Sequence, residues 1–165
     1  MISRLEAKSE SLLGYPVDPF ENVVTDPDED IPPQLPAGLE QLYQAVGAVS
    51  LPDVGNGYFV HPPGYLAEAV ARGMAIRADT DELAGPVMPF GSDGGGTLYC
   101  VAVDSGAVWE LPQGEIDRNG VYLGGMDAPR PIASSVEEFL EKVLVATERF
   151  VESGEITRLD DARKI

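Results

Sequence analysis

The strongest β-strand signal in the chain reads Thr97-Leu-Tyr-Cys-Val-Ala-Val103, and after Asp104-Ser-Gly106 it resumes as Ala107-Val-Trp-Glu-Leu111. Two runs of β-branched and aromatic residues around a short polar turn with glycine predict a β-hairpin. A two-residue turn would place Ala102 opposite Trp109. A three-residue turn with a left-handed glycine would place Val101 opposite Trp109. We favour the three-residue turn, because it gathers the bulky side chains on one face: Tyr99, Val101, Val103, Trp109 and Leu111.

The clearest helix signal lies downstream, at residues 136–154. Ser134 and Ser135 each precede a glutamate by three residues, so either serine can close a capping box at the start of the helix. Gly154 marks its end. Apolar residues recur between these signals with helical period: Val136, Phe139, Leu140, Val143, Leu144, Thr147, Phe150 and Val151. A face this apolar needs a sheet to pack on.

Upstream of the hairpin the signals are shorter. Residues 2–13 form an imperfect amphipathic helix, and residues 36–46 form a second helix that Gly47 can cap. We further expect a small helix at 65–72 and a glycine-rich loop at 91–96, with short strands at 58–60 and 87–90. The chain is then a single domain over residues 1–154, with a proline-rich acidic connector at 14–36 inside it and a polar C-terminal arm at 155–165.

The charge of the chain excludes several classes of function. Among 165 residues there are 11 Lys and Arg against 28 Asp and Glu, which gives a net charge of −17. Such a chain repels nucleic-acid phosphates and anionic membrane surfaces alike. The start of the chain lacks the uninterrupted apolar core of a signal peptide, and no stretch is apolar enough to span a membrane. We therefore expect a cytoplasmic protein that binds neither nucleic acid nor membrane.

The sequence offers no convincing catalytic, metal or cofactor site. The loop Gly91-Ser-Asp-Gly-Gly-Gly96 runs into a strand and has no lysine, unlike a phosphate-binding loop. Asp26, Asp28 and Asp30 alternate as in a calcium loop but lack its glycine and its final glutamate. His61 is the only histidine and has no recognisable partner in sequence, and Cys100 is the only cysteine. We expect no catalytic residue, metal, cofactor or small-molecule substrate.

Several landmarks, taken in order, resemble the SUKH superfamily, whose members carry the SMI/KNR-type domain. They are Leu35-Pro-Ala-Gly-Leu-Glu-Gln-Leu-Tyr43, Pro89-Phe-Gly-Ser-Asp-Gly-Gly-Gly-Thr97, the hairpin 98–111 with Val108-Trp109, and Ser134-Ser-Val-Glu-Glu-Phe-Leu140. The chain departs from the family where Val46-Gly-Ala-Val49 replaces its usual paired glycines. The resemblance implies an α+β fold with helices packed on a curved, mostly antiparallel β-sheet. It carries over fold markers only: Phe90, Gly94, Gly95, Trp109 and Phe139.

The resemblance also implies a function without catalysis. Bacterial SUKH proteins are largely immunity proteins that neutralise polymorphic toxins, often nucleases, and fungal relatives are regulatory scaffolds. Because nucleases must hold phosphates they are generally basic, so an acidic domain suits such a partner. We expect a basic toxin domain as the partner, and the alternatives are a scaffold with several partners or a small carboxylate-based hydrolase. The partner-binding candidates are Asp79, Asp81, Glu82, Asp93, Tyr58 and Tyr65, with Trp109 as a further possible anchor.

Overall fold

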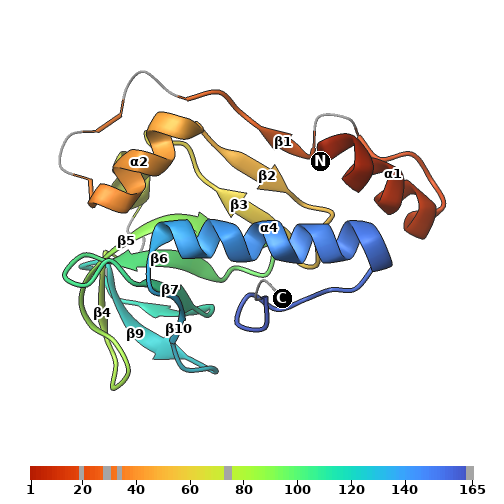
Figure 1. Cartoon of the computed structure of the whole chain (residues 1–165). Coiled ribbons are helices and arrows are strands. Elements are labelled where there is room, and N and C mark those ends of the chain that lie inside the picture. Colours follow the sequence, from red (N-terminus) through yellow and green to blue (C-terminus); the bar gives the residue numbers. More distant parts are fainter. Residues whose placement is uncertain (19–20, 28–30, 33–34, 73–75, 163–165) are drawn as a thin grey trace.

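The computed structural model of the chain describes residues 1–18, 21–27, 31–32, 35–72 and 76–162. Within them the fold is α+β, as expected (Figure 1). The helices are α1 (Ile2–Leu13), α2 (Ala37–Ala45), α3 (Tyr65–Ala71) and α4 (Val136–Ser153). The strands are β1 (Val23–Val24), β2 (Val49–Leu51), β3 (Tyr58–Val60), β4 (Arg77–Asp79), β5 (Ala84–Ser92), β6 (Leu98–Ala102), β7 (Val108–Leu111), β8 (Gly114–Ile116), β9 (Val121–Gly125) and β10 (Arg130–Ala133). None of the described helices combines the length and the apolar character that crossing a bilayer requires.

Strand β5 organises the sheet, because it is long enough to pair with three other strands. It pairs with β4 near its start and with β3 near its end, and β6 pairs along its other side. One branch continues through β3 to β2 and β1, a second through β4 to β9 and β8, and a third through β6 to β7 and β10. The β4–β9 pair is parallel and the other pairs are antiparallel. The sheet is therefore mixed and mostly antiparallel.

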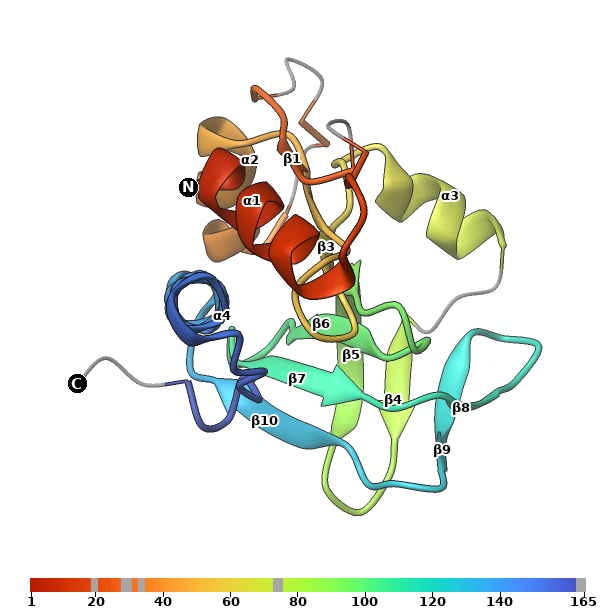
Figure 2. The ribbon, with the colours of Figure 1, turned by 90° about the vertical axis from the view of Figure 1, so that its right-hand side faces the viewer.

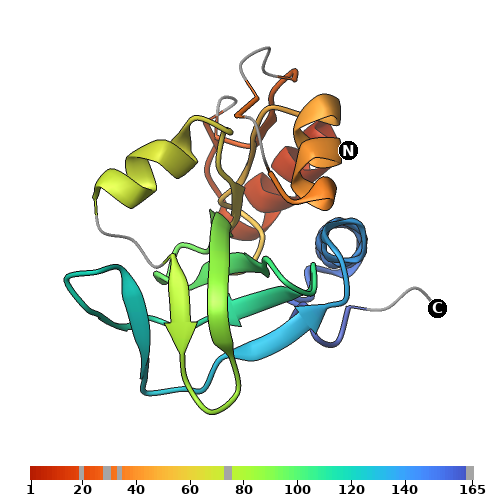
Figure 3. The same cartoon turned by 90° about the vertical axis from the view of Figure 1, so that its left-hand side faces the viewer.

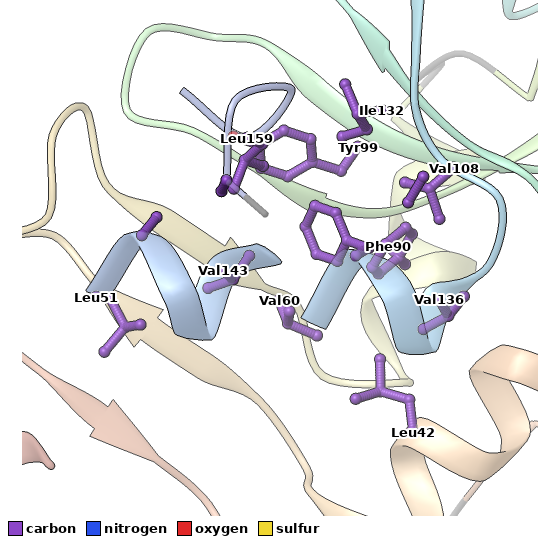
Figure 4. Close-up of a cluster of buried hydrophobic side chains, with 14 of the residues drawn as sticks. Leu42, Leu51, Val60, Phe90, Tyr99, Val108, Ile132, Val136, Val143 and Leu159 are labelled. Carbon is purple, nitrogen blue, oxygen red and sulfur yellow. The ribbon is translucent and has the colours of Figure 1, made fainter. Parts of the chain in front are cut away.

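Three helices, α1, α2 and α4, lie over the main core on one side of the sheet. Viewed along α4, helices α1, α2 and α4 lie on one side and α3 on the other (Figures 2 and 3). Phe139 of α4 contacts the rings of Phe90 and Tyr99, with ring centroids 5.2 and 5.0 Å away. Figure 4 labels Phe90 and Tyr99 among the side chains of this core. Phe90 and Phe139 are almost fully buried. The apolar face of α4 therefore packs on β5 and β6.

A second, smaller core lies on the opposite face of β6. It contains Ala78, Leu83, Val87, Cys100, Ala102, Leu111 and Tyr122, with Leu98, Trp109 and Ile116 packed against it. Tyr122 on β9 is 1% exposed, so the branch β4–β9–β8 folds over the hairpin of β6 and β7. Strand β6 is consequently buried on both faces.

Burial on both faces explains why both expected hairpin registers are wrong. Cys100 lies opposite Trp109 and Val101 opposite Val108. Gly106 is left-handed as expected, with φ +74°, but the turn contains four residues, 103–106. The Ala102 N–H donates to the Ala107 carbonyl at 2.9 Å to close it. The three-residue turn was favoured on the assumption that the hairpin has one apolar face, whereas the hairpin buries apolar side chains on both faces, one in each core.

The glycine after α2 has another role than the expected one. The cap of α2 is Val46, in an extended conformation. Gly47 instead lies against the connector, where a Cβ atom would come within 2.3 Å of the Asp26 carbonyl oxygen. Its N–H donates to the Thr25 carbonyl at 3.1 Å. The connector therefore runs alongside the domain here and contributes β1 to the sheet.

Helix α4 begins and ends where the sequence indicates. Ser135 caps it by accepting the Glu138 N–H at 3.1 Å, and Gly154 ends it with φ +80°. Leu144, expected on the buried face, is 39% exposed.

The segment after Gly154, expected as a polar arm, is packed over its described part. Leu159 and Ala162 are buried in the main core. The Tyr58 hydroxyl donates to the Thr157 carbonyl at 3.2 Å. A few apolar residues are enough to make these contacts, although the segment is polar in its overall composition. Residues 163–165 lie outside the described part.

Candidate binding cleft

The segment after α4 covers one side of a polar hollow, which we call the charged cleft. Its volume is about 280 Å³, and its polar and aromatic lining comprises Asn56, Tyr58, Asp93, Tyr99, Glu110, Arg130, Thr157, Arg158 and Asp160. Figure 2 shows the loop after α4 beside β7 and β10, which supply Glu110 and Arg130. An adjoining hollow of about 430 Å³ shares Glu110, Arg130 and Arg158 and adds Thr97 and Asp127. Residues from five distant stretches of chain thus meet at one place.

Ion pairs hold one wall of the charged cleft. Arg130 on β10 donates to Glu110 on β7 at 2.8 Å and to Asp160 at 3.4 Å. Arg158 also contacts Asp160, at 3.3 Å. The hydrogen bond that Arg130 donates to Glu110 raises the pKa of Arg130 above its ordinary value, and the nearby carboxylates add to this. Both arginines on this wall are therefore already engaged by carboxylates.

The turn that joins β5 to β6 also lines the charged cleft, through Asp93. The Asp93 Oδ1 atom accepts the N–H groups of Gly95 and Thr97, each at 2.8 Å. This arrangement is typical of an aspartate at the start of a tight turn. The Gly94 N–H donates to the Asn56 carbonyl at 2.7 Å, which ties the turn to the loop before β3. The Asp93 carboxylate is thereby held in a fixed position at the edge of the cleft.

Two tyrosines form the inner surface of the charged cleft. Burial, together with the charges of Glu110 and Asp93, raises the pKa of Tyr58 to about 12. Burial, with Asp93, Tyr58 and Glu110, raises the pKa of Tyr99 even more. Tyr99 is 4% exposed, and its hydroxyl makes no hydrogen bond to any residue that the structure describes. Both phenols are protonated at neutral pH and face carboxylates.

The expected partner-binding residues, with Trp109 included, fall into four places. Tyr58 and Asp93 both line the charged cleft. Asp79, Asp81 and Glu82 are exposed at the turn between β4 and β5, which is the opposite end of β5 from Asp93. Nine residues of strand separate these ends by roughly 25 Å. Tyr65 stands apart at the start of α3, and Trp109 packs in the second core.

The sequence analysis did not identify the ion-paired residues of the charged cleft. Glu110, Arg130 and Asp160 lie on different elements, and only the pairing of β7 with β10 and the return of the chain after α4 bring them together. No motif spacing links them. The one available signal was the position of Glu110 in the hairpin, where a carboxylate interrupts apolar residues.

The structure gives His61 a partner that the sequence did not reveal. Its Nε2 atom lies 3.0 Å from the Ser92 hydroxyl, and its ring contacts that of Tyr65, with centroids 4.1 Å apart and the planes tilted by 33°. Burial lowers the pKa of His61 below its ordinary value. A serine–histidine nucleophile also needs an acid to orient the imidazole. Among the described residues no carboxylate hydrogen-bonds this ring.

Metal binding finds no support in the part of the chain that the structure describes. No group of three or more potential metal ligands occurs among those residues. Asp28 and Asp30 of the calcium-like spacing lie outside them.

A third hollow, of about 290 Å³, is apolar and lies between α4, the start of α1 and strands β2 and β3. Its lining includes the exposed Leu144. Nothing in its surroundings indicates an occupant.

No family model, no curated protein and no solved structure matches this chain. The resemblance to SUKH domains therefore rests on the sequence landmarks alone.

Proposed function

We propose that this chain is a non-catalytic protein-binding domain that recognises a basic protein, in the way an immunity protein (antitoxin) neutralises its toxin. The charge balance carries this proposal. Even if each of the 11 Lys and Arg residues neutralised one carboxylate, 17 of the 28 acidic side chains would remain. Such a surface accelerates encounters with a cationic protein and repels anionic ones.

The fold and the landmarks are consistent with an immunity role. An α+β domain with helices on a mostly antiparallel sheet agrees with the architecture that the SUKH resemblance implies. Toxins that cut nucleic acids are generally basic, since they must hold phosphates. An acidic domain of this kind could cover the substrate groove of such a toxin and needs no chemistry of its own.

The scaffold alternative would suit a mobile acidic connector and a free C-terminal arm, but the described parts of both segments contact the rest of the domain. The connector supplies β1, and the segment after α4 buries Leu159 and Ala162. A binding domain that acts as one folded unit fits these contacts better.

One observation favours a second candidate, a hydrolase, namely the 3.0 Å contact between Ser92 and His61. It differs from the carboxylate-based mechanism expected from sequence. Turnover of ester substrates that disappears in Ser92→Ala would establish it and would refute the binding-only proposal.

The experiment begins with the genes beside the one that encodes this chain. Each neighbouring product with a basic C-terminal domain is co-expressed with it, and growth and complex formation are measured. We expect growth to be rescued, and the complex to weaken between about 50 mM and about 500 mM salt as the charges are screened. A matched variant with Asp79, Asp81 and Glu82 replaced by Asn, Asn and Gln tests the acidic turn separately. Unchanged toxicity and no complex with any basic neighbour would refute the proposal.

A further inference from the structure

We propose that the charged cleft receives the guanidinium group of an arginine side chain from the partner protein. This inference rests on the proposed function, because it assumes that the partner is a basic protein. It assigns to Tyr58, Asp93, Tyr99 and Glu110 the role of a specificity pocket. The hydrogen bonds that these side chains still lack, their burial and their charge all indicate this ligand.

The first indication is unused hydrogen-bonding capacity on two carboxylates. The two N–H groups of the turn both bind Asp93 through Oδ1, and Arg130 binds Glu110 through Oε1. The second oxygen of each carboxylate makes no further hydrogen bond to a described residue. A carboxylate can accept several hydrogen bonds, so both groups retain acceptors for a ligand.

The second indication is the Tyr99 hydroxyl. The side chain is 4% exposed and lines the cleft, yet its hydroxyl has no hydrogen-bond partner among the described residues. Figure 4 shows its ring extending from β6 toward Leu159, which also lines the cleft. The hydroxyl oxygen is not one of the fully buried polar atoms that lack a partner, so it reaches the open space of the cleft and can form a hydrogen bond there. A donor that enters the cleft from outside would satisfy it.

The chemistry of the lining selects a planar cation. Aromatic faces and carboxylates attract guanidinium, which carries five donors in a rigid plane. An anion would meet Asp93 and Glu110, while the two arginines present are already paired with Glu110 and Asp160. A volume of about 280 Å³ is large enough to hold one arginine side chain.

The test uses three peptides that differ at one side chain: acetyl-Gly-Arg-Gly-amide, the lysine peptide and the uncharged citrulline peptide. Binding to the full chain is followed by two-dimensional ¹H–¹⁵N NMR. We expect the arginine peptide to bind with a dissociation constant on the order of 1 mM and to shift the amides of Asp93, Gly95, Thr97 and Thr157. The lysine peptide should bind severalfold more weakly and the citrulline peptide not measurably. Equal binding of all three, or shifts confined to other surfaces, would overturn the inference.

Three single substitutions locate the site. Asp93→Asn keeps an oxygen for the Gly95 and Thr97 N–H groups, and Tyr99→Phe removes only the unpartnered hydroxyl. We expect each to weaken the arginine peptide by roughly tenfold. Asp81→Asn makes the same change of charge at the far turn and should leave binding unchanged. Equal effects of Asp81→Asn and Asp93→Asn would mean that general charge, and not the cleft, holds the peptide.

The outcomes separate this inference from the proposed function. A complex with the basic neighbour that tolerates both Asp93→Asn and Tyr99→Phe would overturn the cleft inference and leave the function standing. Peptide binding without any basic protein partner would support the specificity of the cleft and refute the function. If free arginine bound more tightly than the peptide, the inference would be overturned: the ligand of the cleft would be a small organic cation and not a side chain of a partner protein.

Discussion

The hydroxyl of Tyr58 donates to the carbonyl oxygen of Thr157 at 3.2 Å, across 99 residues of sequence. This hydrogen bond joins β3 to the segment after α4 and closes one side of the charged cleft. Leu159, two residues further on, is 5% exposed and packs in the main core. The segment is therefore a structural part of the domain, and its contacts can be measured.

Leu159→Ala should lower the free energy of unfolding by about 2–3 kcal/mol, because it leaves a cavity beside Tyr99. Ile156→Ala is the matched control: Ile156 is 67% exposed, so the change should stay within about 0.5 kcal/mol. Urea denaturation of the two variants checks the difference. Equal losses would contradict the packing of this segment.

Glu138→Gln should destabilise the protein in a pH-dependent manner. Glu138 Oε2 accepts the Ser134 N–H at 2.7 Å and the Ser134 hydroxyl at 2.6 Å. These bonds, with Lys142, lower the pKa of Glu138 from 4.5 to about 2. Because the folded pKa lies below the unfolded one, the stabilisation is complete above pH 4.5 and is lost as the pH falls toward about 2.

For this half-exposed carboxylate the expected loss is about 1 kcal/mol at neutral pH. Thermal melts of wild type and variant should converge as the pH approaches about 2. Glu137→Gln, one residue earlier, should show a smaller loss. A pH-independent difference would contradict the role assigned to the ionised carboxylate.

Tyr99→Phe should leave stability unchanged or raise it by up to about 1 kcal/mol, because the hydroxyl it removes has no partner. Tyr43→Phe removes a hydroxyl that donates to the His61 carbonyl at 2.9 Å, and it should lower stability by about 1 kcal/mol. Chemical denaturation compares the pair. A clear loss in Tyr99→Phe would reveal a hydrogen bond that the cleft geometry does not include.

Gly94→Ala should disturb the turn between β5 and β6, since a Cβ atom there would lie 2.5 Å from the Asn56 carbonyl oxygen. We expect a loss of about 1–3 kcal/mol and altered amide shifts at Asp93. Gly95→Ala is the control, because its Cβ would lie at an ordinary 3.4 Å from the Asp93 oxygens. Similar stabilities of the two variants would show that the turn adapts freely.

Local signals predicted the helices well. The serine at position 135 and the glycine at position 154 determine the ends of α4 through contacts within a few residues. The start and end of α1 at Ile2 and Leu13 follow equally local apolar spacing.

The sheet was harder to predict, because the pairing of its strands depends on segments that are far apart in the sequence. The hairpin register is set by burial of β6 on both faces, which requires β9 to fold over it. Strands β8 and β9 contain Gly114 and Gly125, where a Cβ atom would come within 2.4 Å of a carbonyl oxygen of the paired segment. Such glycines suggest turns when only the sequence is read.

The candidate site was predicted in part. Tyr58 and Asp93 were chosen from sequence, and both line the charged cleft. Arg130 and Asp160 were not, because 30 residues and a whole helix separate them.

Cys100 provides the molecule with a built-in reporter. It is the only cysteine, it is fully buried in the second core, and burial raises its pKa. A thiol in this state cannot be alkylated until the strands around it separate. The rate at which iodoacetamide alkylates Cys100 therefore measures how often the sheet opens, and it can be determined on the wild-type protein without any engineered label.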